Sequence, residues 1–507
     1  MVQRALLTVA ALTLAAQSAF AGDAWEAKLD HALRQRAHAP RGASRVIIQT
    51  TADVQADALV RAARGTPIGR LPTLGAEVAD VPDASLESLA RRPGVRTISL
   101  DRPVRGTLDR TAATIGAVWV RENLGFDGAG VGVAVIDSGV TARHDDLGSS
   151  RVVHFADFVN ALAQPYDDYG HGTHVAGIIA GNGTDSAGAR RGLAPGAHLV
   201  ALKVLDAVGN GYISNVIAAL DYAVDVRTTF NIRIINLSVA AGVYESYETD
   251  PLTQAARRAV DAGIVVVTAA GNAGRSADGK PQYGGITAPG NAPWVLTVGA
   301  ASHMGTPDRA DDTVAPFSSR GPTRIDNAAK PDLVAPGVGI ESLADPASTL
   351  FVTRPAARLW GTSPTVTPPY LSLSGTSQAA PVVSATIALM LQANPLLTPN
   401  AVKAILQYTA EANGRYNHLT QGAGFLNARG AVQLAQAWTG MGAAVDSGTM
   451  TPDAGAWPPD VVRGAAIATP GEAVTWGAVT CDNIVWSTRE DARDRRSCMT
   501  KAVWGIR

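Results

Sequence analysis

The middle of this 507-residue chain predicts an α/β fold with a mostly parallel central sheet and helices on both faces. Short, continuous apolar runs alternate there with segments of helical periodicity, such as residues 213–226 and 252–262. Continuous apolar runs are typical of parallel strands buried on both faces, and the intervening helices indicate crossover connections. Five runs carry this prediction: Val131–Ile136, Leu199–Leu205, Ile232–Leu237, Ile264–Ala269 and Trp294–Val298.

A smaller α+β unit is predicted ahead of the sheet. Strand patterns at Val46–Ile48, Gly75–Asp80 and Val95–Leu100 alternate with helical patterns at 53–64 and 84–91. This β-α-β-α-β order is typical of a small two-layer unit. Residues 101–110 are charged and contain Pro and Gly, so we expect a linker there.

The two ends of the chain differ from its middle. Residues 1–21 combine Arg4, the apolar run Ala5–Ala16 and Ala19-Phe20-Ala21, which predicts a secretory signal peptide with a cleavage site. We therefore expect a secreted or periplasmic protein with no membrane segment after signal removal. Residues 441–507 are rich in Gly, Pro, Thr and Trp and read as a small C-terminal extension. Cys481 and Cys498 could form a disulfide there in an oxidising compartment.

Composition narrows the classes of protein and of partner. The chain is 46% hydrophobic and 17% charged, which fits a well-buried globular core. Its formal net charge of −1 gives no reason to expect nucleic acid or an anionic membrane surface as a partner.

The segment Leu373–Pro381 presents a serine at the start of a helix. Gly375 permits a sharp turn, Thr376 and Ser377 follow, and an apolar helical pattern continues beyond Pro381. The hydroxyls of Thr376 and Ser377 are expected to cap the first free amides of this helix. Alone, the segment is compatible with either a plain helix cap or a nucleophilic serine.

Three further polar residues stand at predicted strand ends or helix starts. Asp137 follows the run Val131–Ile136, where it could be a buried partner of a cation or simply a turn residue. His171 lies between Gly170 and Gly172; with His174 it could share a metal, although a structural role for His174 fits better. Asn272 follows the run Ile264–Ala269 and could donate to an oxyanion or merely form a turn.

Together, these segments resemble the subtilisin-like serine peptidases, the subtilase family. Four motifs in one order carry the resemblance: Val135–Gly139, His171–Gly177, Ala270–Asn272 and Ser374–Pro381. The resemblance implies a subtilisin-like α/β domain over 111–440. It also implies that a small ferredoxin-like propeptide occupies 22–110, with its core at about 45–103.

The resemblance also implies the role of each site residue. Ser377 would attack the peptide carbonyl, His171 would transfer protons, and Asp137 would orient His171. The side chain of Asn272 and the backbone amide of Ser377 would hold the oxyanion. No cofactor is required for this chemistry.

Substrate binding follows from the same resemblance. An extended peptide would pair with Ser238, Val239 and Ala240 on one side and with the segment of Gly209 and Gly211 on the other. Ala270 and Gly271 would line an apolar primary pocket, so we expect broad specificity with a preference for apolar residues. The expected partners are protein or peptide substrates and the chain's own propeptide, and the expected state is a monomer.

Several expectations remain open at this point. Self-cleavage is predicted between Leu100 and Thr114, and a rim loop over 341–370, where the chain is longer than the compact family pattern. Structural calcium is common in the family, but its ligands are unknown here; Asp145 and Asp146 could contribute or be solvated turn residues. Gln378 replaces a frequent methionine, which is expected to alter packing or oxidation sensitivity more than chemistry. The alternative function is a catalytically silent homologue that acts as a binding or surface-interaction protein.

Overall fold

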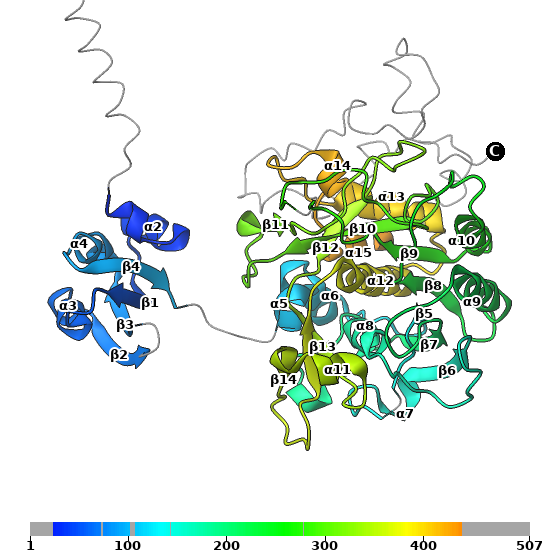
Figure 1. Cartoon of the computed structure of the whole chain (residues 1–507), viewed down its shortest axis with the longest axis horizontal. Helices are drawn as coiled ribbons and strands as arrows, with labels where there is room; N and C mark the ends of the chain where they lie inside the picture. Colours follow the sequence, from blue (N-terminus) through cyan, green and yellow to red (C-terminus); the bar gives the residue numbers. More distant parts are fainter. Residues whose placement is uncertain (1–23, 72–74, 102–106, 142, 277, 439–507) are drawn as a thin grey trace, which may run out of the picture. The chain divides into compact units, whose positions relative to one another are not determined.

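The computed structural model describes residues 24–71, 75–101, 107–141, 143–276 and 278–438. The chain divides after Val104 into two compact units (Figure 1). The predicted signal peptide, the C-terminal extension and the Cys481–Cys498 pair lie outside the described residues. Among the described helices, none combines the length and the apolar character needed to cross a membrane.

The first unit packs helices on one antiparallel sheet with the strand order β2-β3-β1-β4. Strand β2 was not expected, and it changes the predicted order to βαββαβ, the order of ferredoxin-like folds. Val46, Ile48, Leu86 and Ile98 are fully buried in its core. The elements are η1 (Glu26–Lys28), α2 (His31–His38), β1 (Ala43–Thr50), α3 (Ala56–Ala62), β2 (Thr66–Leu71), β3 (Ala76–Pro82), η3 (Asp83–Ser85), α4 (Leu86–Ala90) and β4 (Val95–Leu100).

The second unit is built on an eight-stranded sheet, and all five predicted strands are confirmed in it. The strand order is β11-β10-β9-β8-β5-β7-β6, with β12 paired to β10. All of these pairings are parallel except the one between β10 and β11. The strands are β5 (Gly132–Asp137), β6 (Val152–Asp157), β7 (His198–Lys203), β8 (Ile232–Leu237), β9 (Val265–Ala269), β10 (Leu296–Ser302), β11 (Thr313–Val314) and β12 (Leu333–Pro336).

Helices cover both faces of this sheet, which explains why its strands read as continuous apolar runs (Figure 1). Val133 and Val135 of β5 join one core, whereas Ala134 and Ile136 join the other. The first core is shared with α5 (Thr107–Thr114), α6 (Ala117–Leu124), α8 (His171–Ala180), α12 (Thr376–Ala393), α13 (Pro399–Thr409) and α15 (Ala428–Ala437). The second is shared with α9 (Ile213–Asp225) and α10 (Pro251–Asp261).

Residues 341–370, expected as a rim loop, contain regular structure instead. They contribute to a three-stranded antiparallel sheet of β13 (Ile340–Leu343), β15 (Tyr370–Leu373) and β14 (Arg358–Leu359). Two hydrogen bonds hold the helix α11 (Thr349–Thr353) beside the loop before α8. The amides of Thr349 and Leu350 donate to the carbonyls of Asp168 (2.9 Å) and Tyr169 (3.0 Å). The remaining elements are α7 (Gly148–Arg151), η4 (Thr184–Ser186), η5 (Arg309–Asp311), η6 (Pro355–Ala357) and α14 (His418–Gln421).

Strand β5 lies in the middle of the large sheet, between β7 and β8. On one side of β5 the chain first forms the outer strand β6 and then β7, which lies between β5 and β6; on the other side it adds β8, β9 and β10 in order. In such sheets a crevice forms beyond the carboxyl ends of the strands where the order reverses.

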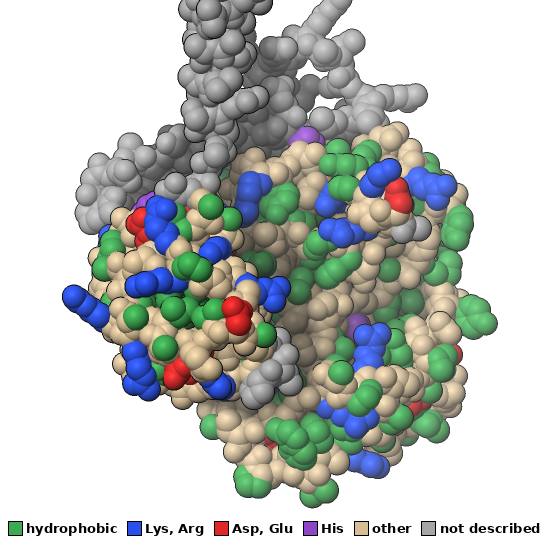
Figure 2. All heavy atoms as spheres, turned by 60° about the vertical axis from the view of Figure 1, so that its left-hand side comes forward, with side chains coloured by type: hydrophobic (Ala, Val, Ile, Leu, Met, Phe, Trp, Pro, Cys, Tyr) green, Lys and Arg blue, Asp and Glu red, His purple; other side chains and the backbone are tan. Residues whose placement is uncertain are grey.

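On the visible face of the molecule, Lys and Arg side chains are scattered among neutral and acidic ones (Figure 2).

Candidate active site

Asp137 and His171 form a hydrogen-bonded pair at this edge of the sheet. Asp137 ends β5 and is fully buried, and its Oδ1 lies 2.8 Å from Nδ1 of His171, the first residue of α8. The same oxygen accepts the amide of Ser138 at 2.8 Å. Gly172 permits the close approach, because a Cβ there would stand 2.0 Å from the carbonyl oxygen of Gly139. The strand end and the helix start are therefore held together by main-chain contact as well as by this pair.

The surroundings of His171 raise the pKa of its imidazole. Burial alone lowers the pKa, but the charge of Asp137, its hydrogen bond and the charge of Asp167 outweigh that effect. The side chain is 15% exposed, so the ring is not fully enclosed. The Asp137 contact favours the tautomer with its proton on Nδ1, which leaves Nε2 with a lone pair when the ring is neutral.

Asp167, which the sequence did not single out, joins the strand end to the helix start. Its Oδ1 accepts the hydroxyl of Ser138 (2.8 Å) and the amide of Gly170 (2.7 Å), and its Oδ2 accepts the amide of Thr173 (2.7 Å). The hydroxyl of Ser138 in turn accepts the amide of Gly172 (2.9 Å). An aspartate four residues before a helix-starting histidine was the available signal, since such carboxylates often satisfy free helix amides.

Ser377 lies in the first turn of α12 and contacts the end of β8. Its Oγ donates to the carbonyl of Ser238 at 3.0 Å, and the hydroxyl of Ser238 donates to the carbonyl of Ser377 at 3.0 Å. The expectation that Thr376 and Ser377 cap this helix is wrong. Both hydroxyls point away from the helix amides, because they bind groups that follow β8 and β9 instead.

Asn272 takes over the capping of α12. Its Oδ1 accepts the amide of Thr376 at 3.0 Å and the hydroxyl of the same residue at 3.1 Å, and that hydroxyl accepts the amide of Gly271 at 3.1 Å. This contact orients the carboxamide so that its Nδ2 lies 3.5 Å from the position that a Cβ on Gly375 would take. Within the described residues, neither that Nδ2 nor the backbone amide of Ser377 has a hydrogen-bond acceptor. Two donors are thus available beside Ser377.

Gln378, the next residue, contacts the imidazole directly. It is 2% exposed, and its Nε2 lies 3.2 Å from Nε2 of His171. The expectation that this residue affects packing more than chemistry stays a prediction, and this contact is the reason to test it. Within the described residues, no hydrogen bond joins Ser377 Oγ to His171 in this state.

His174 does not share a metal with His171. Its Nε2 lies 3.1 Å from the carbonyl oxygens of both Ile340 and Leu371, whereas His171 turns toward Asp137. Burial lowers the pKa of His174 to about 3, so the ring is neutral and fastens the third sheet to α8. This geometry favours the structural role.

The segments expected to bind substrate differ in how close they lie to these groups. Ser238 contacts Ser377, and the exposure of the chain increases through Val239 to Ala240. Gly209 lies against the ring of Tyr169, because a Cβ there would stand 2.5 Å from that ring. The centroid of the Tyr169 ring is in turn 6.4 Å from the centroid of the His171 ring. Gly211 is exposed, whereas Ala270 and Gly271 are buried behind Asn272.

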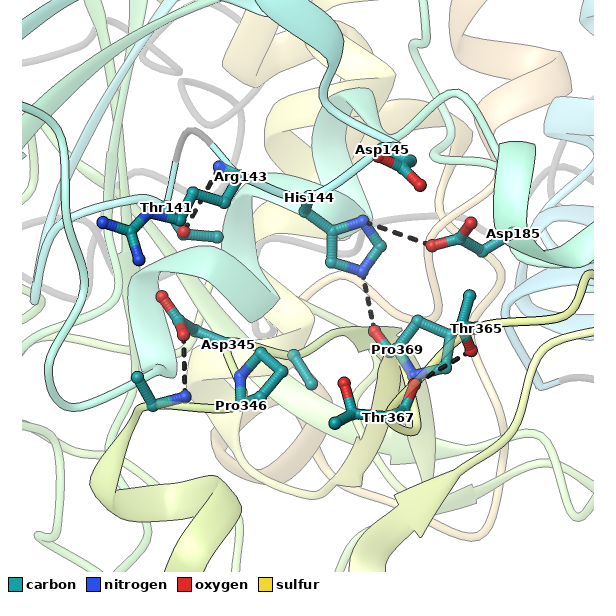
Figure 3. A pocket seen from close by; sticks show the side chains of 12 residues that line it. Thr141, Arg143, His144, Asp145, Asp185, Asp345, Pro346, Thr365, Thr367 and Pro369 are labelled. Carbon is teal, nitrogen blue, oxygen red and sulfur yellow. Dashed lines mark hydrogen bonds and ion pairs between the residues drawn. The ribbon is translucent and has the colours of Figure 1, made fainter.

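One cluster of the described residues has the spacing of metal ligands: His144, Asp146 and Asp185, whose ligand atoms lie within 4.8 Å of one another. His144 and Asp185 border a pocket (Figure 3). Both oxygens of Asp146 already accept hydrogen bonds, from the Asp185 amide (2.8 Å) and the Tyr370 hydroxyl (2.7 Å). His144 Nε2 lies 2.7 Å from the carbonyl of Pro369. Calcium takes six to eight oxygen ligands, which this group does not supply, and Asp145 is exposed. The calcium expectation stays a prediction.

These contacts define the class of protein. A buried aspartate bound to a histidine, a serine at a helix start and two amide donors beside it form the arrangement of a serine hydrolase. The family described as the subtilase family matches residues 128–428. The chain belongs to the subtilase family, and by that membership it is a serine-type endopeptidase.

Two relatives with known names agree with this assignment, and one solved structure is also similar. The chain is 38% identical to serine protease AprX of Bacillus subtilis over 361 residues, which covers 70% of this chain and 78% of that protein. It is 35% identical to subtilisin E of the same organism over 310 residues, which covers 61% of this chain and 67% of that protein. A crystal structure of a cold adapted subtilisin-like serine proteinase is 30% identical, covers 60% of this chain and 88% of that chain, and has a TM-score of 0.44.

Proposed function

We propose that this protein is a secreted serine endopeptidase that uses Ser377, His171 and Asp137 as its catalytic triad and is activated by removal of its N-terminal unit. The observation that carries the proposal is the Asp137–His171 hydrogen bond of 2.8 Å beside a helix-starting serine. Family membership supports the reaction class, and the predicted signal peptide supports export.

The first half of the reaction forms an acyl-enzyme. Ser377 Oγ attacks the carbonyl carbon of the scissile bond while His171 Nε2 takes the hydroxyl proton. The negative charge that develops on the carbonyl oxygen is stabilised by Asn272 Nδ2 and the Ser377 amide. The C–N bond then breaks, and His171 gives its proton to the leaving amine.

The second half returns the enzyme to its starting state. Water attacks the ester carbonyl, His171 Nε2 takes a proton from that water, and the tetrahedral intermediate collapses. The ester C–O bond breaks, Ser377 Oγ receives the proton from His171, and the new carboxylic acid leaves. Asp137 accepts the Nδ1–H of His171 throughout and stabilises each imidazolium.

Substrate recognition is proposed to depend mainly on main-chain pairing. Ser238, Val239 and Ala240 would form one strand beside an extended peptide, and the Gly209 and Gly211 segment would form the other. Small, uncharged walls at Ala270 and Gly271 support a preference for apolar side chains. Such an enzyme acts on many proteins, and we propose that it does so as a monomer.

The test is chemical labelling of the mature enzyme with a fluorophosphonate, together with a peptide-hydrolysis assay. Wild type is expected to be labelled once, on Ser377, and to lose its activity in step with labelling. Ser377→Ala is expected to show neither labelling nor hydrolysis. Ser374→Ala should retain both, because within the described residues the Ser374 hydroxyl contacts the Gly339 amide (2.9 Å) and no group of the site. A correctly processed wild type that is neither labelled nor active would favour the silent binding homologue instead.

A further inference from the structure

The carboxamide of Gln378 extends from the imidazole toward the two free amide donors. Its Nε2 lies 3.2 Å from His171 Nε2, and its Oε1 lies 2.7 Å from the position that a Cβ on Gly375 would take. Asn272 Nδ2 and the Ser377 amide lie 3.5 Å and 3.6 Å from that same position. A buried polar side chain thus occupies the space beside the nucleophile, in contact with the proton-transferring nitrogen.

Hydrogen-bond chemistry determines which form of His171 this contact suits. With the proton on Nδ1 facing Asp137, the neutral ring has only a lone pair at Nε2. A carboxamide N–H is a donor, so the contact stabilises the neutral imidazole. With Oε1 directed toward the two amide donors, the carboxamide offers His171 only its N–H, so the imidazolium would meet an N–H group and lose the bond.

The position of Ser377 Oγ is consistent with this arrangement. The hydroxyl donates to the carbonyl of Ser238 (3.0 Å), so in this state the Nε2 lone pair is taken by Gln378. For the nucleophilic attack, Ser377 Oγ has to turn from Ser238 to His171, and the carboxamide has to release that nitrogen.

We propose that Gln378 is a positioning residue that binds the neutral form of His171 in the resting enzyme, lowers the affinity of Nε2 for a proton, and is displaced from it by Ser377 when substrate binds. The proposal rests on the proposed function, because it assigns a resting state to the same triad. Gln378 acts through His171 and performs no bond-making step of its own.

The remaining ionisable groups around His171 are independent of Gln378. Asp137 reaches the ring from β5, Asp167 and Tyr169 from the loop before α8, and His174 from α8 itself. From α12, the element on the other side, the contact is made by the uncharged Gln378. A substitution of Gln378 by an apolar residue therefore changes no charge near the imidazole.

The experiment is the pH profile of kcat/KM for a peptide anilide, whose acid limb reports the titration of the free enzyme. In Gln378→Met the acid limb is expected to move upward by about half a unit to one pH unit, the equivalent of one hydrogen bond to the neutral ring. In Gln378→Glu the shift is expected to be larger in the same direction, because a carboxylate favours the imidazolium. The matched control is Gln392→Met on the same helix, where the glutamine accepts the amides of Asp127 (2.8 Å) and Gly128 (2.6 Å) and should leave the acid limb in place.

The outcomes separate this proposal from the proposed function. An active Gln378→Met enzyme whose acid limb coincides with that of wild type overturns the positioning role, as does an unmoved limb in Gln378→Glu. Should the methionine variant fail to fold, Gln378→Leu provides the same apolar test. A wild type without peptidase activity or Ser377 labelling would instead refute the proposed function itself.

Discussion

The Asn272 side chain uses its two ends for different purposes. Its Oδ1 holds the first amide and the hydroxyl of Thr376, and its Nδ2 is one of the two donors next to Ser377. The residue therefore links the end of β9 to the helix that carries the proposed nucleophile. A substitution that keeps Oδ1 but removes the Nδ2 donor can therefore test the role of Asn272 in catalysis separately from its role in capping the helix.

Removing the donor while keeping the acceptor is expected to affect kcat much more than folding. Asn272→Asp retains an oxygen for Thr376 but places negative charge where the oxyanion forms. We expect kcat to fall by at least about 10²–10³, the size typical for loss of one oxyanion donor, with a smaller change in KM. Asn272→Ala should show a similar fall in kcat together with a lower melting temperature, because the Thr376 amide also loses its partner. A near-normal kcat in the aspartate variant would exclude Asn272 from oxyanion binding.

His171 determines the acid side of the pH profile. Its imidazole must be neutral to take the Ser377 proton, and its pKa is raised because Asp137 and Asp167 outweigh the effect of burial. Activity should therefore fall as pH decreases through a midpoint above about 6.5, the ordinary value for histidine. Asp167→Asn, which removes one of the two negative charges, should lower that midpoint in a kcat/KM titration. An upward move or no move would show that Asp167 does not contribute to the field at the ring.

At the scale of residues, Asp137, His171, Asn272 and Ser377 were nominated by their places at strand ends and helix starts together with the resemblance to the subtilase family. Side-chain direction was not available from the sequence alone. Thr376 and Ser377 looked like helix caps, yet their hydroxyls bind groups beyond β8 and β9. The reach of Gln378 to His171 likewise depends on a rotamer that no local pattern specifies.

At the scale of secondary-structure elements, the central strands of the large sheet were predictable, whereas β2 and β6 were not. β5, β7, β8, β9 and β10 are covered on both faces, so each appears as an apolar run. β2 is largely exposed and contains Pro67 and Gly69, and β6 is a half-buried edge strand. Their stability comes from pairing with a neighbour already in place, which leaves little periodicity in the sequence.

A buried ionic cluster lies next to the start of β12. In this cluster one aspartate binds two lysines. Asp332 contacts Lys330 at 2.7 Å and Lys403 at 3.0 Å, and each of the three side chains is at most 4% exposed. Burial lowers the pKa of Lys330 to about 7, because the single negative charge of Asp332 does not compensate two ammonium groups. The folded state therefore binds the Lys330 proton more weakly than the unfolded chain does.

This imbalance predicts a stability that rises with pH. Between about pH 7 and 10.4 the unfolded chain binds the extra proton, so this site increases the free energy of unfolding with pH by up to about 1.4 kcal/mol per pH unit. Lys330→Met is expected to remove that slope and to leave a balanced Asp332–Lys403 pair. The test compares the change in melting temperature between pH 7 and pH 9.5 for inhibited wild type and inhibited Lys330→Met. The control is Lys280→Met, at an exposed lysine. If the melting temperatures of wild type and Lys330→Met changed equally with pH, Lys330 would not be the source of the slope.

At the scale of the whole molecule, the chain consists of two units with separate hydrophobic cores. The second begins with α5, whose end is fastened to the rest of that unit: the Thr114 hydroxyl donates to the Thr306 carbonyl (3.0 Å), and Arg309 Nη1 donates to the Thr114 carbonyl (3.2 Å). Peptidases bind their substrates as extended chain, so a folded helix is a poor cleavage site.

We therefore expect self-cleavage between Leu100 and Thr107, a narrower range than the Leu100–Thr114 expected from the sequence. Mass spectrometry of the purified mature protein gives its N-terminus directly. Ser377→Ala should retain residues 22–100, and adding active enzyme should restore cleavage at the same bond. An identical, shortened N-terminus in wild type and in Ser377→Ala purified from a protease-deficient host would rule out self-processing.

The central position of β5 also has a consequence for how the second unit folds. β5 is the first strand of its sheet to be synthesised, yet its neighbours β7 and β8 come much later in the chain, with Gly132 paired to both His198 and Ile232. Pairing between segments so distant in sequence requires closing long loops before any contact is gained, which slows folding.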